Sequence, residues 1–262
     1  MTFETLLYEV SDGVATITFN RPEGANAMDP QMALELAEVG ILCDDDPAVR
    51  AVVFTGAGRM FCAGGDLGAF AGAGAGRKSL LKKMAGDFHM GLSRLARGNA
   101  PVIAAVNGTA AGAGMSLVMA CDLAVAAESA VFTMAYTRAG LVPDGSSTFY
   151  MPRKIGDRRT RELMLTNRVL KAEEALQWGI VNEVAADEVV LERAQAIARE
   201  LASGPTLAFG AVKTLLNGTF EQTLESQMEL EARAIAELSV SADGEEGITA
   251  FVEKRKPEFK GE

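Results

Sequence analysis

Short apolar segments alternate with helical patterns along the first half of the chain. The segment at residues 14–20 alternates apolar and polar positions, which predicts a strand with one face solvated or weakly covered. The segments at 50–56 and 101–108 are almost wholly apolar, as expected of strands that are covered on both faces. A fourth strand is predicted at residues 121–130. Three segments between the strands have the 3.6-residue period of an α-helix and are predicted helices: residues 30–44, 78–97 and 113–120.

The order of these elements predicts the fold class. Strands and helices repeat as strand-strand-helix without a fixed short period, which indicates β-β-α turns stacked in one α/β core. The last ~60 residues differ, because they are helical in pattern and are punctuated by Gly204-Pro205 and Asn217-Gly218. We therefore expect a core formed by residues 1–200 and a mainly helical C-terminal region, residues 201–262, that docks on the core or on a neighbouring subunit.

Composition and charge exclude several classes of protein. The 262-residue chain has a formal net charge of −10 and no run of lysine and arginine, so most of its surface would repel nucleic acid. No apolar run of about 18 residues, signal-peptide pattern, Walker A loop, GxGxxG or HExxH motif is found in the sequence. The three cysteines lack metal-ligand spacing and are expected to be reduced and buried in a cytoplasmic protein: Cys43, Cys62 and Cys121.

Two glycine-rich segments follow predicted strands, where α/β folds place ligand sites. They are RMFCAGGDLGAF at residues 59–70 and NGTAAGAGMSLVMACD at residues 107–122. Glycine has no Cβ, so a ligand can approach the backbone closely, and the second segment also opens a helix whose first N–H groups lack acceptors. Two such N–H groups that converge form an oxyanion hole. The Gly/Ala-rich stretch at residues 68–79 is either a mobile connector or a flexible wall of the ligand pocket.

The chain resembles the crotonase superfamily, also called the enoyl-CoA hydratase/isomerase family, over nearly its whole length. The resemblance rests on ordered motifs: VATITFNRPEGANAMD, AVVFTGAGRMFCAGGDL, PVIAAVNGTAAGAGMSLVMACDLAVAAESAVF, RELMLTNRVLKAEEALQWGIVNEV and FVEKRKPEF. It implies a crotonase-like spiral of β-β-α turns, a homotrimer or a dimer of trimers, and an acyl-CoA thioester substrate. No cofactor is expected apart from the coenzyme A of that substrate, and no metal, nucleic acid or membrane partner.

The resemblance also implies roles for single residues. It places the two oxyanion-hole N–H groups on Gly65 and Ala113, which would hold the thioester oxygen as it becomes an enolate. Asp66 is interpreted as a structural carboxylate of the first loop and Tyr136 as a wall of the pocket. In the family the C-terminal segment often reaches the CoA of a neighbouring subunit, although ordinary helix packing explains such residues equally well. The residues expected to contact CoA or acyl group are Arg21, Ala25, Ala27, Ala63, Asp66, Leu67, Tyr136, Phe251 and Lys254.

The acid–base residues of the family differ in this chain. Hydratases carry two glutamates, and the corresponding positions here are Ser116 and Tyr136, so hydration by a glutamate pair is not expected. Asp144, within RAGLVPDGSSTFYMPRKIG, resembles the GLxPD aspartate that is the proton shuttle of enoyl-CoA isomerases of phenylacetate degradation. The structural alternative is that Asp144 caps the helix that begins nearby. Isomerases of that type show a Gly-Gly pair where this chain has Ser146 and Ser147.

Four functions are compatible with this pattern. The leading hypothesis is an acyl-CoA double-bond isomerase in which Asp144 acts as acid and base. The alternatives are a hydratase or lyase in which Asp144 positions water, and a non-catalytic acyl-CoA-binding protein. The fourth is a dehalogenase, because the family's 4-chlorobenzoyl-CoA dehalogenases use an aspartate at this position together with a histidine from the helix that corresponds to that of His89. Those enzymes carry tryptophan at the position of Tyr136, and His89 is expected to be a partly exposed helix residue.

Overall fold

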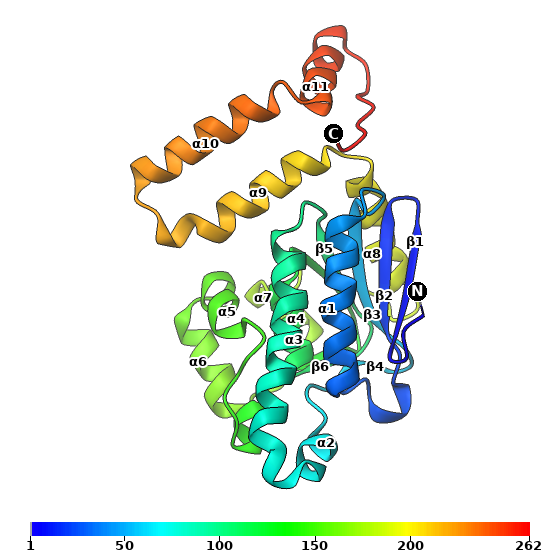
Figure 1. Cartoon of the computed structure of the whole chain (residues 1–262), viewed down its shortest axis with the longest axis vertical. Coiled ribbons are helices and arrows are strands. Elements are labelled where there is room, and N and C mark those ends of the chain that lie inside the picture. Colours follow the sequence, from blue (N-terminus) through cyan, green and yellow to red (C-terminus); the bar gives the residue numbers. More distant parts are fainter. Residues whose placement is uncertain (1) are drawn as a thin grey trace.

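The computed structural model describes residues 2–262 and contains two sheets with helices packed around them (Figure 1). The larger sheet has six strands in the order β1-β2-β3-β5-β7-β10. Strands β1 and β2 are antiparallel, and all other neighbours in this sheet are parallel. The strands are β1 Leu6–Ser11, β2 Val14–Phe19, β3 Ala51–Gly56, β5 Val102–Val106, β7 Leu123–Ala127 and β10 Glu183–Ala185.

Three of these strands are each followed by a short strand of a second sheet. The second sheet has the order β4-β6-β8-β9, in which only the β8–β9 pair is antiparallel. The chain therefore steps from the large sheet to the small sheet and then into a helix, which confirms the predicted spiral of β-β-α turns. The elements of these turns are β4 Met60–Cys62, β6 Thr109–Ala111, β8 Val131–Thr133, β9 Leu170–Lys171, α3 Arg77–Arg97, α4 Ala113–Ala120 and α5 Ser147–Ile155.

Two long helices, α1 and α3, lie side by side, and α3 lines the site described below (Figure 1). Helix α1, Pro30–Asp45, begins after Asp29, whose side chain accepts the Met32 N–H at 2.8 Å, and has proline in its first position. Helix α3 buries one stripe with helical spacing and leaves its charged residues exposed. The buried residues of α3 are Met84, Phe88, Gly91, Leu92 and Leu95.

The remaining elements cover the sheets or lie beyond them. Helix α8, Val190–Ala202, packs on strands β3, β5 and β7. Shorter elements connect the layers: η1 Pro22–Gly24, α2 Leu67–Gly72, η2 Gly74–Gly76, η3 Tyr136–Ala139, α6 Asp157–Thr166 and α7 Ala172–Trp178. The C-terminal part is helical in the described residues: α9 Thr206–Gly218, η4 Thr219–Glu221, α10 Leu224–Leu238 and α11 Ala242–Glu253.

Buried polar contacts attach the C-terminal helices to the core. Lys213 of α9 is buried, lies 3.1 Å from the carboxylate of Asp122 and donates hydrogen bonds to two core carbonyls, those of Leu95 and Ala100. Arg50, just before β3, donates to Gly204 O at 2.6 Å and to Phe259 O at 3.2 Å. A buried charge requires such partners, so these contacts fix where α9 leaves the core.

The predicted elements agree with the observed ones to within a few residues, and helix α4 matches at both ends. The short strands β4, β6, β8 and β9 were not predicted, because two or three residues carry too little periodicity. The three cysteines are free and buried, as expected. Among the described residues, no helix has the length and apolarity needed to cross a membrane.

Candidate active site

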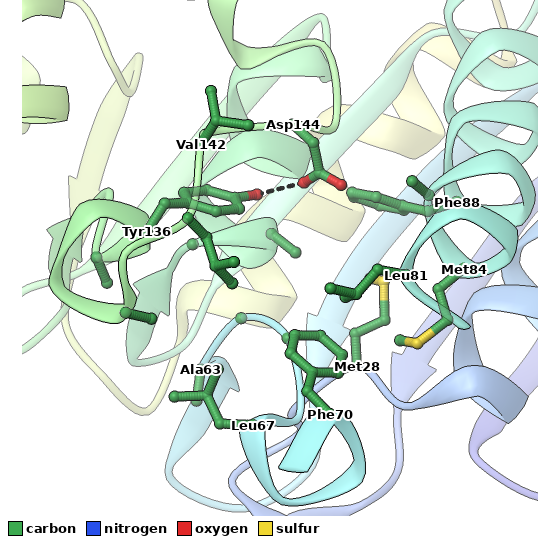
Figure 2. Close-up of a pocket in the computed structure, with 18 of the residues that line it drawn as sticks. Met28, Ala63, Leu67, Phe70, Leu81, Met84, Phe88, Tyr136, Val142 and Asp144 are labelled. Atoms are coloured by element: carbon green, nitrogen blue, oxygen red, sulfur yellow. Dashed lines mark hydrogen bonds between the residues drawn. The ribbon is translucent and has the colours of Figure 1, made fainter. Parts of the chain in front are cut away.

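A cavity of about 380 Å³ lies where the two glycine-rich segments, helix α3 and the loop before α5 meet (Figure 2). Most of its wall is apolar, and its polar side chains are Lys82, Tyr136 and Asp144. In the view of Figure 2, Asp144 lies across the cavity from Ala63 and Leu67. The apolar side chains that line it include Met28, Leu67, Phe70, Leu81, Met84 and Phe88.

The two glycine-rich segments are in contact, as the sequence predicts. A Cβ built on Gly64 would lie only 3.3 Å from the Cα of Gly112 and 3.1 Å from the carbonyl oxygen of Ala111. Gly65 and Ala113 follow these contacts and both line the cavity. Neither N–H donates to an acceptor among the described residues, because Gly65 forms only an isolated bridge with Met28 and Ala113 is the first residue of α4. Two free backbone donors are thus available to an oxygen in the cavity.

Asp144 is held by a hydrogen-bonded chain of side chains. The Tyr136 hydroxyl donates to Asp144 Oδ1 at 2.7 Å, the bond that Figure 2 marks. Ser116, fully buried in α4, lies 3.1 Å from the same hydroxyl, and its Oγ donates because the phenol proton is already engaged. The two positions that carry glutamate in family hydratases are therefore hydrogen-bonded to each other and connect to the carboxylate.

Tyr136 stays protonated in this chain of hydrogen bonds. Burial raises the pKa of Tyr136 well above its ordinary value, and the neighbouring negative charge of Asp144 raises it further. The phenol is therefore a hydrogen-bond donor throughout the pH range in which the protein would work. Tyr136 lines the cavity, and its bond to Asp144 is an addition that the sequence did not show.

His89 lies beside Asp144, which sequence reasoning did not predict. It is a half-exposed residue of α3, as expected, but its Nε2 is 3.8 Å from Asp144 Oδ2 and accepts the Gly145 N–H at 3.1 Å. Because Nε2 is an acceptor, the neutral ring carries its proton on Nδ1. One feature of the sequence pointed to this proximity. His89 is the single histidine of the chain, and it lies in the helix that corresponds to the one with the histidine of the family's dehalogenases.

The alternative in which Asp144 caps helix α5 is wrong. The residue before the helix is Ser146, in a left-handed conformation with φ 63°, and no side chain caps the first turn. The carboxylate of Asp144 is engaged by Tyr136 instead, while its backbone carbonyl accepts from the Ser147 hydroxyl at 2.8 Å. The Ser146-Ser147 pair therefore stabilises the backbone of the loop that carries Asp144.

The Gly/Ala-rich stretch after the first glycine segment is folded, and one of its residues, Phe70, lines the cavity. It folds into α2 and η2 because Asp66 caps α2, accepting the Ala69 N–H at 3.0 Å. This N–H bond, together with the Arg21 guanidinium at 3.1 Å, lowers the pKa of Asp66. Asp66 is thus the structural carboxylate that the sequence predicts, and it positions Leu67 and Phe70 against the ligand space.

The expected CoA-binding residues near the N-terminus lie beside the cavity and not in its wall. Arg21 forms ion pairs with Asp29 and Asp66 and donates to the Ala27 carbonyl. The Ala25 carbonyl accepts the Ala63 N–H at 3.1 Å. The carbonyl of Ala63 accepts no hydrogen bond among the described residues, and Ala63 lines the cavity.

Phe251 belongs to helix α11, and Lys254 is the residue that follows its last turn. Neither residue lines the cavity. Phe251 is 86% exposed. Within one chain neither residue reaches the site, so a role in CoA binding would require a neighbouring subunit and stays a prediction.

Comparison with known proteins identifies the family. The model of the enoyl-CoA hydratase/isomerase family matches residues 9–262. The chain is 41% identical to a probable enoyl-CoA hydratase of Rhodobacter capsulatus, over 100% of both chains. It is 40% identical to the 1,2-epoxyphenylacetyl-CoA isomerase of Escherichia coli, over 98% of this chain and 99% of the relative. A crystal structure of a putative enoyl-CoA hydratase from Streptomyces coelicolor superposes with a TM-score of 0.94 at 34% identity, covering 100% of this chain and 96% of that one.

The chain therefore belongs to the enoyl-CoA hydratase/isomerase family and has the crotonase fold that the sequence resemblance implied. It is an enzyme of this family.

Proposed function

We propose that the protein is an enoyl-CoA isomerase that moves a double bond with Asp144 as its single acid–base group. The observation that carries this proposal is that Asp144 is the only carboxylate among the described residues that line the apolar cavity. One carboxylate is sufficient for a 1,3-proton shift, because the group that removes a proton from one carbon returns it to another. Hydration by two carboxylates has no second partner here, since Ser116 and Tyr136 occupy the glutamate positions.

The reaction would proceed through an enolate of the thioester. Asp144 removes a proton from the α carbon of a 3-enoyl-CoA, and the electron pair of the C–H bond moves onto the thioester oxygen. The N–H groups of Gly65 and Ala113 stabilise that negative oxygen. The protonated Asp144 then donates to the γ carbon while the electron pair returns, which leaves the 2-enoyl-CoA and the carboxylate. No cofactor beyond the coenzyme A of the substrate takes part.

The charge at the cavity mouth supports an anionic substrate on a protein of net charge −10. Helix α3 begins with the segment RKSLLKK, and Lys82 of this segment lines the cavity. None of its four basic side chains forms an ion pair with a carboxylate among residues 2–262. These cations would attract the phosphates of CoA to the entrance. The Ala63 carbonyl would accept from the adenine.

A homotrimer or a dimer of trimers would use the C-terminal helices. Helix α10 has no buried residue, although it carries several apolar side chains. Many exposed apolar side chains in one region are typical of a subunit interface. The exposed apolar residues of this region include Leu216, Phe220, Leu224, Met228, Ile235, Phe251 and Val252. The three buried free thiols suit a cytoplasmic location.

The test is a side-by-side assay of 3-enoyl-CoA and 2-enoyl-CoA of the same chain length. We expect the first to be converted to the second, with slow or no addition of water to the second. Hydration of the 2-enoyl-CoA with an inert 3-enoyl-CoA would contradict the isomerase proposal and favour the hydratase that the Rhodobacter relative's name suggests.

A second candidate is the dehalogenase alternative, which the position of His89 beside Asp144 favours. Tyr136 stands where those enzymes carry tryptophan, so we rank it below the isomerase. Adding 4-chlorobenzoyl-CoA to the assay and measuring chloride release separates the two.

A further inference from the structure

Asp144 forms part of the wall of a second, more polar cavity as well as of the acyl cavity. The second cavity has a volume of about 820 Å³ and lies between α3, the start of α5 and the end of α9. Of the residues that line the two cavities, Asp144 is the only one that they share. The polar side chains that line the second cavity include His89, Ser93, Arg97, Thr148, Asn217 and Glu221.

The two carboxylate oxygens of Asp144 have different surroundings. Oδ1 accepts the hydrogen bond from Tyr136, a residue of the acyl cavity. Oδ2 is the oxygen nearer to His89, which lines only the second cavity. The Asp144 side chain is 36% exposed and that of His89 is 49% exposed, so water can reach both. Oδ2 has no hydrogen-bond donor among the described residues, which leaves it as the oxygen that can hold a proton.

We propose that the second cavity is a proton-exchange route, through which Asp144 exchanges the proton taken from the acyl group with solvent before it protonates the γ carbon. This inference rests on the proposed isomerase function. Asp144 Oδ2 gains the proton from the α carbon while the electron pair of that C–H bond moves to the thioester oxygen. The resulting carboxylic acid then gives its proton to water in the second cavity and receives another from water, with no net change of charge. The new proton goes to the γ carbon.

His89 borders this route and does not replace Asp144 as the base. Its Nε2 faces Oδ2 but already accepts the Gly145 N–H, so it has no free lone pair for a substrate proton. Polar and charged groups along the cavity can hydrogen-bond water next to the carboxylate, which is the condition for fast exchange. The acyl cavity is largely apolar and offers no comparable path.

The test is isomerisation of a 3-enoyl-CoA in D₂O, stopped early, with mass spectrometry of the 2-enoyl-CoA product. We expect most product molecules to carry one deuterium. Substrate kept in D₂O without the protein is the control and should show only background deuteration. Product that retains the original proton would overturn the exchange route while leaving the isomerase function intact. Absence of any isomerisation would overturn the proposed function, and this inference with it.

A variant at the second cavity tests the path itself. Ser93 lines only the second cavity, is exposed, and lies one helical turn after His89. Because helical side chains lean toward the preceding turn, Ser93→Trp should cover His89 and obstruct the cavity without touching the acyl site. Met90→Trp is the matched control, because Met90 is an exposed residue of the same helix that lines neither cavity.

We expect Ser93→Trp to lower the deuterated fraction of the product to less than about half of the wild-type value, since it excludes water from Oδ2. Met90→Trp should leave that fraction unchanged. An unchanged fraction in Ser93→Trp, with isomerisation retained, would show that exchange does not pass through this cavity and would overturn the proposal.

Discussion

The hydroxyl of Tyr136 donates a hydrogen bond of 2.7 Å to Oδ1 of Asp144, eight residues further along the chain. The resemblance places the glutamate of family hydratases at the position of Tyr136, and in this chain that position carries a donor to another carboxylate. A protonated phenol fixes the orientation of Asp144 and leaves its second oxygen free. This arrangement suits a reaction that needs one well-positioned base.

Replacing Asp144 with asparagine should abolish isomerisation while acyl-CoA still binds. General acid–base catalysis by a positioned group typically contributes about 10²–10⁴-fold, and kcat should fall by that order. Asparagine has nearly the same shape, so the affinity for a saturated acyl-CoA, measured by calorimetry, should change little. Unchanged turnover in this variant would favour a role for Asp144 outside the chemistry.

Tyr136→Phe should lower kcat by about 10–100-fold, because a hydrogen bond to a charged group contributes roughly 1.5–3 kcal/mol. The variant loses the donor that holds the Asp144 carboxylate in position. The alkaline limb of the kcat/KM profile should be the same in both proteins.

The alkaline result follows from the raised pKa of Tyr136. Burial and the charge of Asp144 keep the phenol protonated as the pH rises through 10, the ordinary pKa of tyrosine. A wild-type loss of activity below that pH that disappears in Tyr136→Phe would show that the phenol ionises there, against this prediction.

Gly114→Ala tests the contact between the two glycine-rich segments. A Cβ at this position in α4 would lie 2.4 Å from the carbonyl oxygen of Cys62, so the helix must move away from the loop that carries Gly65. We expect kcat to fall by about 10²-fold, the order seen when one oxyanion donor is lost.

The matched control is Gly86→Ala in helix α3, where a Cβ meets no atom within 4 Å. This change should leave kcat unaltered and stabilise the protein by about 0.5–1 kcal/mol through helix propensity. Comparable activity in the two variants would mean that the spacing of the segments is not critical, against the oxyanion-hole proposal.

Gly145→Ala should both destabilise the protein and displace Asp144. Gly145 has φ +59°, and a Cβ there would lie 2.5 Å from the ring of Phe88 and 2.9 Å from Ser116. Left-handed backbone costs alanine about 1–2 kcal/mol, and overpacking adds a further ~1–3 kcal/mol.

Gly140→Ala provides the comparison, because Gly140 also has a left-handed φ of +69° but a Cβ there meets nothing within 4 Å. It should show the backbone cost alone in urea-unfolding experiments and keep most of the activity. Equal losses of stability in the two variants would contradict the packing argument at Gly145.

The sequence was sufficient to predict strands β2, β3, β5 and β7, the long helices and the two glycine-rich segments, but not strand β1. Strands such as β3 and β5 are apolar throughout because both faces are covered, and helix α4 starts at Ala113 because small residues open it after a strand. The contact between residues 64 and 112 was predictable as well, since both segments follow parallel strands and therefore meet at one edge of the core.

Only the tertiary structure decided the surroundings of Asp144. Periodicity describes which face of an element is buried but not which side chains from separate elements meet, and His89, Ser116 and Tyr136 reach Asp144 from α3, α4 and η3. Nothing local distinguishes a capping aspartate from one held by a distant phenol, because both precede a helix in the same way. The sequence by itself determined the family of the chain, its two glycine-rich segments and the presence of Asp144. The packing of α3 against the loop before α5 determined which side chains surround that carboxylate.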